Sequence, residues 1–327
     1  VLTGCYPQAF PAEAAAVTEA DIVTGALGRA ALPQMVRDFS LDRQRIVNIP
    51  QHEKGETFEA CSAADFGVRT RAFLKIQDGC DNWCSYCIIP AARGPVRSKP
   101  MPELQRELAA LAQNGYREIV LTGINLSNYG REWGLHLSDA VLAAAATEGV
   151  ERVRLGSIEP DLLTPQEIYR LAEGCRGKLC PQFHLSLQSG CDATLRRMNR
   201  HYDTAGYRAV AEAVRQAFPG AALTTDMMVG FAGETEEDHR QSLAFAREIG
   251  FAKIHAFAYS RRAGTRAALM PDQVPQAEKK RRCAELIAVA AELRKTALTA
   301  MLGQVQPVLF ESRGQQGCTG YTPNYTP

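Results

Sequence analysis

Six short β-rich runs, each followed by a stretch with helical periodicity, constrain the fold of this chain more than any other feature. The runs cover residues 72–77, 118–123, 152–157, 182–187, 222–230 and 252–260. Helix signals lie between them, such as Thr164 with Glu167 three residues later, and Thr235 followed by Gly250. Strand–helix units in this order predict a parallel sheet with right-handed crossovers, either open or curled into an incomplete barrel.

The most unusual residues follow the first run, in the segment CDNWCSYC (80–87). In parallel sheets, reactive groups gather at the carboxyl ends of the strands. Cys80, Cys84 and Cys87 have the spacing C-x3-C-x2-C, without a fourth cysteine nearby. Cubane iron–sulfur clusters usually bind four thiolates, so three on one loop leave one iron open to a small molecule. A zinc site with a distant fourth ligand and chance burial are the less favoured alternatives.

Composition limits the class of protein. With 327 residues, 46% of them hydrophobic, the chain can bury one large core or two modest ones. The sequence contains neither an apolar run of 18 residues nor a charged-then-apolar signal segment. Ten clustered cysteines without such a signal favour a reducing cytosol and metal or redox chemistry. Residues 261–300 carry an excess of positive charge, which fits a solvated helix face as well as RNA contact.

The pattern along the chain predicts four parts. Residues 1–50 show a separate strand–helix alternation, expected to be the C-terminal part of another α/β domain. Residues 51–70 are a polar linker, residues 71–302 form the strand–helix body, and residues 303–327 begin a small β-barrel. Both ends of the chain look cut, so we expect it to be a piece of a longer protein.

The segment CDNWCSYC resembles the cluster motif of the radical S-adenosylmethionine (SAM) enzymes, whose fold is a partial (β/α)6 barrel. The resemblance implies that Cys80, Cys84 and Cys87 hold a [4Fe–4S] cluster whose open iron binds the amino and carboxylate groups of SAM. An electron from the cluster would then cleave SAM to a 5′-deoxyadenosyl radical. Further SAM contacts are implied at Tyr86, Gly123, Asn125 (where the family has glutamate), Gln188, Ser189, Asp226 and Tyr259. Each of the strand-end residues is, by itself, also explained by packing or a turn.

Longer stretches are similar to the methylthiotransferases, which insert sulfur and methylate it. These enzymes have an N-terminal domain with a second [4Fe–4S] cluster, a radical domain, and a β-barrel RNA-binding module called TRAM. The stretch GCYPQ (4–8) implies that Cys5 is a ligand of the second cluster, whereas without the resemblance it would be a small buried residue. RTRAFLKIQDGC, LGSIEPDLL, LRRMNRHY and YSRRAGTRAA best match the family that methylthiolates C2 of N6-threonylcarbamoyladenosine next to the tRNA anticodon. The chain departs from the pattern at Ala91, Ala232 and Ala258.

This resemblance also implies partners: a tRNA anticodon arm, an electron donor such as flavodoxin or ferredoxin, and a cytoplasmic location. The candidate RNA contacts are Arg93, Arg97, Arg261 and Arg262, which could pair with phosphate or carboxylate groups, and Tyr321 and Tyr325, which could stack on bases. The alternatives are methylthiolation of isopentenyl-adenosine or of an aspartate in a ribosomal protein, and a non-catalytic RNA-binding iron–sulfur protein. Cys61, Cys175, Cys180, Cys191, Cys283 and Cys318 have no assigned role. His184 and His255 could face the barrel interior, although ordinary core histidines are expected.

Overall fold

The computed structural model describes residues 1–59, 67, 70–315 and 317–327. All six predicted strands are present and confirm the strand–helix alternation. They are β3 (Arg71–Lys75), β6 (Glu118–Thr122), β7 (Arg152–Leu155), β9 (Gln182–Leu185), β10 (Ala222–Val229) and β11 (Lys253–Ala258). The third strand resumes after Gly156 as β8 (Ser157–Ile158), which was not expected from the sequence.

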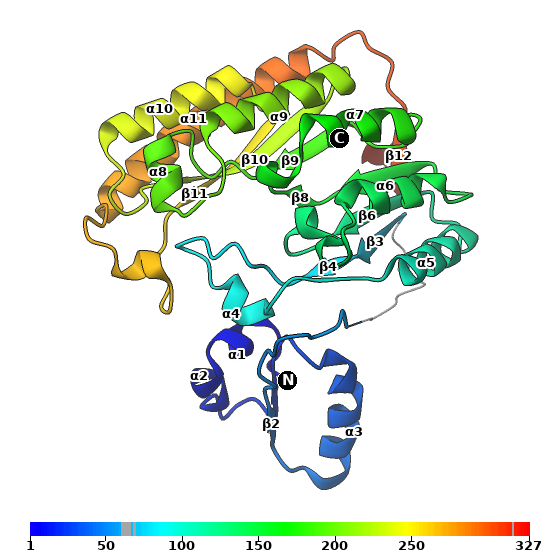
Figure 1. Cartoon of the computed structure of the whole chain (residues 1–327), viewed down its shortest axis with the longest axis vertical. Helices are drawn as coiled ribbons and strands as arrows, with labels where there is room; N and C mark the ends of the chain where they lie inside the picture. Colours follow the sequence, from blue (N-terminus) through cyan, green and yellow to red (C-terminus); the bar gives the residue numbers. More distant parts are fainter. Residues whose placement is uncertain (60–66, 68–69, 316) are drawn as a thin grey trace.

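Gly156 separates β7 from β8, which belong to two different parallel sheets. One sheet has the order β3-β6-β7 and the other has the order β8-β9-β10-β11, with each neighbouring pair parallel. The Gly156 amide still donates to the Leu121 carbonyl, so the chain leaves the first sheet only after this residue. The six strands therefore follow one another in sequence order as one parallel wall (Figure 1).

Helices cover one face of this wall (Figure 1). The longer ones are α5 (Met101–Gln113), α6 (Leu137–Ala146), α7 (Pro165–Gly174), α9 (Thr204–Ala217), α10 (Glu236–Ile249) and α11 (Gln276–Thr299). The short helices α4 (Ile89–Arg93) and α8 (Asp192–Arg197) lie in the connections of the wall. The described residues also contain 3-10 turns at Arg29–Ala31, Leu126–Asn128, Arg131–Trp133, Pro160–Leu162 and Arg266–Leu269. The predicted caps are confirmed, because Thr164 and Thr235 accept the amides of Glu167 and Asp238.

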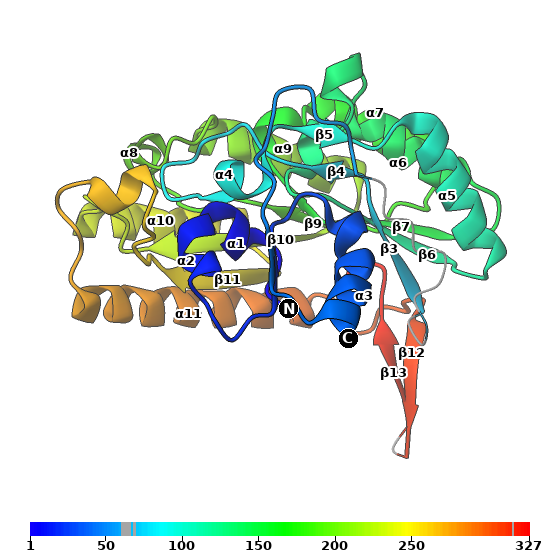
Figure 2. The ribbon, with the colours of Figure 1, turned by 90° about the horizontal axis from the view of Figure 1, so that it is seen from below.

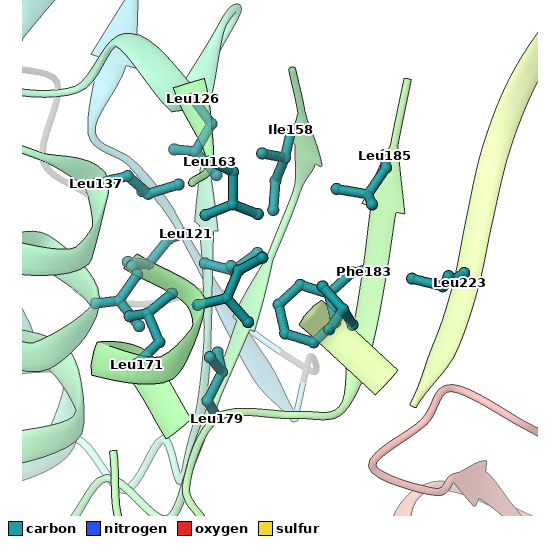
Figure 3. Close-up of a cluster of buried hydrophobic side chains, with 14 of the residues drawn as sticks. Leu121, Leu126, Leu137, Ile158, Leu163, Leu171, Leu179, Phe183, Leu185 and Leu223 are labelled. Carbon is teal, nitrogen blue, oxygen red and sulfur yellow. The ribbon is translucent and has the colours of Figure 1, made fainter. Parts of the chain in front are cut away.

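The two faces of the strands differ in polarity. Phe183, Leu185 and Leu223 point toward the helices and are buried, and Leu171 of α7 belongs to the same buried cluster (Figure 3). Burial of such side chains stabilises the fold by about 1.5–3 kcal/mol each. From Leu223 onward, fully buried residues of β10 alternate with partly buried ones. The partly buried residues are Thr224, Asp226 and Met228, and they lie on the opposite face of the strand. Because strand side chains alternate, these residues form a half-buried inner face.

The first fifty residues contain a further, two-stranded parallel sheet with short helices. This segment contains α1 (Cys5–Ala9), α2 (Pro11–Ala15), β1 (Ile22–Thr24), α3 (Leu32–Asp42) and β2 (Ile46–Asn48), and β1 pairs with β2 in parallel. This confirms the predicted strand–helix alternation. Helix α1 packs against α4 of the main body (Figure 1). Much of the predicted linker, including Cys61, lies outside the described residues.

Where the start of a small β-barrel was expected, a hairpin follows α11 as β12 (Leu309–Gly314) and β13 (Gly317–Tyr321), which pair antiparallel and project away from the wall (Figure 2). The rings of Tyr321 and Tyr325 stack with their centroids 4.7 Å apart. The guanidinium groups of Arg71 and Arg154 lie 5.2 and 4.4 Å from the Tyr325 centroid. Since Arg71 begins β3, this contact is at the amino end of the strand.

The basic run of α11 is largely used within the protein. Arg282 is buried and pairs with Glu234, with Nη1 and Oε1 2.9 Å apart. Arg281 pairs with Glu236 of α10 as well as with Glu285 one turn along its own helix. These contacts favour the helix-face interpretation of the charge excess. In the described part of the chain, no helix combines the length and apolar character needed to cross a membrane.

Candidate functional site

The three-cysteine loop leaves the carboxyl end of β3 and is closed at its base by a short antiparallel pair, β4 (Gln77–Asp78) and β5 (Arg97–Ser98). The Cys80 amide donates to the Gly94 carbonyl at 3.1 Å. Gly79 has φ +75°, and a Cβ built there would lie 1.8 Å from the Pro95 carbonyl oxygen. Only glycine fits this close approach, so the sequence Gly79–Cys80 fixes where the loop begins.

Two other segments hold the far side of the loop. The Ser85 amide donates to the Met198 carbonyl at 2.9 Å, and Asn199 donates its side-chain amide to the Trp83 carbonyl at 3.1 Å. Met198 and Asn199 directly follow α8. The Ala267 amide, from the connection after β11, donates to the Ser85 carbonyl at 2.7 Å. The cysteine loop is therefore held by chain segments from three regions of the sequence.

The three thiols are half-buried, and this burial raises their pKa values, that of Cys87 to about 11. A free thiol here stays protonated at neutral pH, so a metal has to displace the proton.

Arg200 is a site residue that the sequence did not identify. Its Nη1 lies 3.1 Å from Cys84 Sγ and 3.4 Å from the Tyr86 hydroxyl, and its side chain is 3% exposed. Nη2 pairs with Glu159, and the guanidinium lies 4.9 Å from the Tyr202 ring centroid. Burial raises the pKa of Cys84, whereas the Arg200 charge opposes this rise. The only indication of Arg200 in the sequence was the stretch LRRMNRHY, which matched the family but did not assign a role to any single residue.

Asn125 and Gly123, both predicted SAM contacts, follow β6, and Asn125 lies beside the first cysteine. Asn125 Nδ2 is 3.7 Å from Cys80 Sγ, while its Oδ1 is buried and has no hydrogen-bond partner among the described residues. A free acceptor at this position fits an ammonium group. A Cβ at Gly123 would lie 2.9 Å from Gln77 Oε1, so the backbone approaches its neighbours closely there.

Tyr86 and Tyr259, also predicted SAM contacts, come together in an aromatic patch. Phe231 lies between them, with centroid distances of 6.3 Å to Tyr86 and 5.1 Å to Tyr259, both edge-to-face. Met198 and Ala267 complete this small cluster. The Tyr259 hydroxyl is buried and finds no partner in the described chain. Phe231, Met198 and Ala267 are fully buried, so only the half-buried edge of this cluster, at Tyr86 and Met228, is open to a nucleobase.

The remaining predicted cofactor residues do not join this patch. The Ser189 hydroxyl lies 3.0 Å from the Ser242 hydroxyl of α10, so its side chain faces the helices and the prediction of a SAM contact there is not supported. Gln188 has φ +65°, and its backbone bonds to Asp226 and Met228. Asp226 lies on the inner face, 3.5 Å from His184. Pattern alone did not show which face Ser189 occupies.

Arg93 and Arg97 were predicted to contact RNA, but both are buried in ion pairs. Arg93 donates to both oxygens of Asp78 at 2.8 and 2.7 Å, and Arg97 pairs with Glu56 at 3.0 Å. They stabilise the base of the cysteine loop and are not free for a substrate. Arg261 and Arg262 are exposed after β11. Burial raises the pKa of Cys87, and the charge of Arg262 acts against it, so Arg262 lies near the cluster loop.

The other cysteines divide by exposure. Cys175 and Cys180 are buried, and burial raises the pKa of each to about 11. This environment agrees with a structural role. Cys5 is exposed on α1, so the alternative prediction of a buried small residue is wrong.

Residues 74–246, just over half of the chain, match the model of the radical SAM superfamily. This range includes all three cysteines of the loop and extends into α10. The chain belongs to the radical SAM superfamily. Such enzymes use a [4Fe–4S] cluster and SAM, and the three thiols, the Asn125 oxygen and the aromatic patch fit these groups. When bound, the cluster would supply the electron that cleaves SAM.

Relatives place this radical SAM protein in the methylthiotransferase family. It is 37% identical to the threonylcarbamoyladenosine tRNA methylthiotransferase MtaB of Bacillus subtilis (strain 168), over 99% of this chain and 73% of that protein. It is 34% identical to MtaB of Thermotoga maritima, over 99% of this chain and 74% of that protein. A tRNA-2-methylthio-N(6)-dimethylallyladenosine synthase of Caldicellulosiruptor saccharolyticus is also 34% identical, over 94% and 66%.

Solved radical SAM structures share the fold. The methyltransferase TsrM of Kitasatospora setae superposes with a TM-score of 0.51 at 16% identity, covering 60% of this chain and 38% of that one. Coproporphyrinogen III oxidase (HemN) of Escherichia coli superposes with a TM-score of 0.50 at 15% identity, covering 77% and 61%. These likenesses support the predicted parallel α/β architecture of the radical SAM domain.

Proposed function

We propose that this enzyme methylthiolates C2 of N6-threonylcarbamoyladenosine next to the anticodon of tRNA. The observation that carries the proposal is the similarity to MtaB proteins over 99% of the chain, together with the three-thiol loop and its SAM-compatible surroundings. A reduced [4Fe–4S] cluster requires an electron donor, for which flavodoxin or ferredoxin is suited. Because tRNA is the proposed substrate, we expect the enzyme to act in the cytoplasm.

A second [4Fe–4S] cluster is proposed at Cys5. Its thiol is exposed, and α1 packs against α4, which begins two residues after Cys87. Residues 1–50 therefore bring Cys5 to the same side of the molecule as the three-thiol loop. One thiolate alone does not hold a cubane cluster, so Cys5 would be one of several ligands. We keep the predicted division at residues 50, 70 and 302 as part of this proposal.

Substrate RNA is proposed to reach the cysteine loop past Arg261 and Arg262. Both are exposed, and guanidinium groups pair bidentately with phosphate or with the carboxylate of the threonylcarbamoyl group. Tyr325 is 40% exposed and stacks on Tyr321. We propose that the hairpin region binds RNA at a distance from the reacting base, as the start of a TRAM module would.

The similarity to a dimethylallyladenosine synthase favours isopentenyl-adenosine tRNA as the second candidate substrate. Mass analysis of tRNA nucleosides from cells lacking and regaining the gene separates the two. The 2-methylthio derivative of threonylcarbamoyladenosine should disappear and return. If the isopentenyl derivative responds in its place, or if only a ribosomal protein changes, the proposal is wrong.

A matched pair of variants tests the arginines. Arg262→Ala should reduce the preference for threonylcarbamoylated over unmodified anticodon stem–loops by roughly 10- to 150-fold, as expected for loss of about 1.5–3 kcal/mol of a charge-assisted contact. Arg266→Ala, which removes another exposed charge from the same connection, serves as the control. Equal effects of the two substitutions would indicate a general contribution of charge and no specific pairing.

A further inference from the structure

A second group of metal-binding side chains lies on the inner face of the wall, separate from the three thiols. His184 on β9, Asp226 on β10 and His255 on β11 each offer one ligand atom, and these atoms all lie within 4.8 Å of one another. In the strand registers, His184 is opposite Thr224, and Asp226 is opposite His255. Three adjacent strands therefore carry the three side chains toward one point, on a backbone fixed by sheet hydrogen bonds.

The hydrogen bonding of His184 leaves one ring nitrogen available. Its Nδ1 lies 3.1 Å from the Thr224 hydroxyl, which also accepts from Gln182 at 3.2 Å. Its Nε2 is buried, and in the described residues it has no hydrogen-bond partner, although Asp226 Oδ2 is 3.5 Å away. Metal-binding histidines characteristically hold one nitrogen in such a contact and direct the other at the ion.

The charge of the third side chain also suits a cation. The Asp226 side chain is 33% exposed, and its carboxylate faces the two rings. A cation placed between them would have two nitrogen ligands and one anionic oxygen ligand.

We propose that His184, Asp226 and His255 bind a divalent transition-metal ion such as Zn²⁺ or Fe²⁺. Two imidazoles and one carboxylate are a donor set used by both ions. An ion about 2.1 Å from each ligand holds the ligand atoms roughly 3–3.5 Å apart. The proposal therefore requires the three ligand atoms, now within 4.8 Å of one another, to move closer by side-chain rotation when the ion binds. Three protein ligands leave at least one coordination position open.

The position of the proposed metal site indicates which ligand could occupy its open coordination position. Met228 is two residues beyond Asp226 on the same face of β10 and packs against the aromatic patch of Phe231 and Tyr259. Two residues of a strand span about 6.6 Å, so the metal site is within the length of a nucleoside from the proposed SAM pocket. Resting on the proposed function, we expect the carboxylate of the threonylcarbamoyl group to complete the coordination. An isopentenyl group has no such oxygen.

Equilibrium dialysis of the cluster-loaded protein against Zn²⁺, followed by elemental analysis, tests the site without RNA. The wild type should bind one zinc more than Asp226→Asn or His255→Ala. Thr224→Val, which removes the contact to His184, should weaken zinc binding by about 10–100-fold. His201→Ala removes an exposed histidine and should leave zinc binding unchanged. Zinc held by cysteines is common to all variants, and cluster absorbance verifies that each is folded.

Equal zinc content in the wild type and in both ligand variants would overturn the inference. The carboxylate assignment has its own measurement, the affinity for threonylcarbamoylated and unmodified stem–loops with Zn²⁺ present. His255→Ala should lose the preference. A preserved preference would disprove the carboxylate contact while the zinc difference still supports the metal site. A change in the nucleoside modified in cells would refute the proposed function and would leave the zinc result standing.

Discussion

The Arg200 guanidinium donates to the Cys84 sulfur at 3.1 Å, in a pocket where its side chain is 3% exposed. A buried positive charge next to a cluster ligand stabilises the more negative, reduced state of that cluster. The same guanidinium pairs with Glu159, which holds it in place. Arg200 therefore links the chemistry of the cysteine loop to the end of α8.

Arg200→Gln is expected to make the cluster harder to reduce. If the substitution removes about 1.4 kcal/mol of stabilisation of the reduced cluster, the midpoint potential shifts by roughly 60 mV for a one-electron couple. The midpoint potential should therefore become more negative, as measured by redox titration monitored by electron paramagnetic resonance. Arg200→Lys, which keeps the charge, should shift the potential less. An unchanged potential in Arg200→Gln would show that the contact does not tune the cluster.

Cys84→Ala should abolish retention of the [4Fe–4S] cluster at the loop and cleavage of SAM to 5′-deoxyadenosine. Two thiolates do not replace three, because a second iron then lacks a protein ligand. Iron analysis and chromatography of the nucleoside product measure the two effects. Cys175→Ala removes a buried thiol distant in sequence from the loop and should retain both properties. A Cys84→Ala protein as active as the wild type would exclude Cys84 as a ligand.

Gly79→Ala should prevent the cysteine loop from closing. Its φ of +75° costs a residue with a Cβ about 1–3 kcal/mol, and the clash with the Pro95 carbonyl adds to this cost. We expect the variant to lose the cluster while circular dichroism shows its helices intact. Gly177→Ala is the matched control, since its φ is +82° and no described atom lies within 4 Å of the added Cβ. Full iron content in Gly79→Ala would contradict the proposed role of this close approach.

Asp238 should contribute stability that depends on pH. Burial would raise its pKa, but the Thr235 amide and the Arg197 guanidinium outweigh burial and lower it. Because the folded pKa lies below the unfolded one, the contribution is complete above the unfolded pKa of about 3.9 and is lost as pH falls through the folded pKa. Asp238→Asn should destabilise the protein by about 1–3 kcal/mol at neutral pH.

Denaturation of the cluster-free wild type and Asp238→Asn, at pH 7 and pH 3, measures this difference without a contribution from cluster loss. The gap between the two proteins should shrink at pH 3. Glu237→Gln, on the exposed side of the same helix turn, should have little effect at either pH. A gap of equal size at both pH values would show that the ionised form of Asp238 is not responsible.

The six strands were predictable because each run has its own local pattern and its own turn signals. The division of the third strand at Gly156 could not be predicted, because it depends on which strands pair with each other across the wall. Similarly, the cysteine spacing indicated the cluster loop directly. Arg93 was assigned to RNA because the sequence does not show that Asp78, fifteen residues earlier, folds against it. Arg200 lacked a local signal, as its partners Cys84 and Glu159 are 116 and 41 residues away.

The contact between Arg71 and Tyr325 affects how the chain can fold during synthesis. Arg71 Nη1 donates to the Tyr325 hydroxyl at 3.0 Å across a separation of 254 residues. At about 5–20 residues per second, a ribosome needs roughly 13 to 50 s to extend the chain from one residue to the other. During that interval the amino end of β3 lacks its final partner. Nascent chains are therefore expected to expose this end to chaperones until Tyr325 and its neighbours emerge.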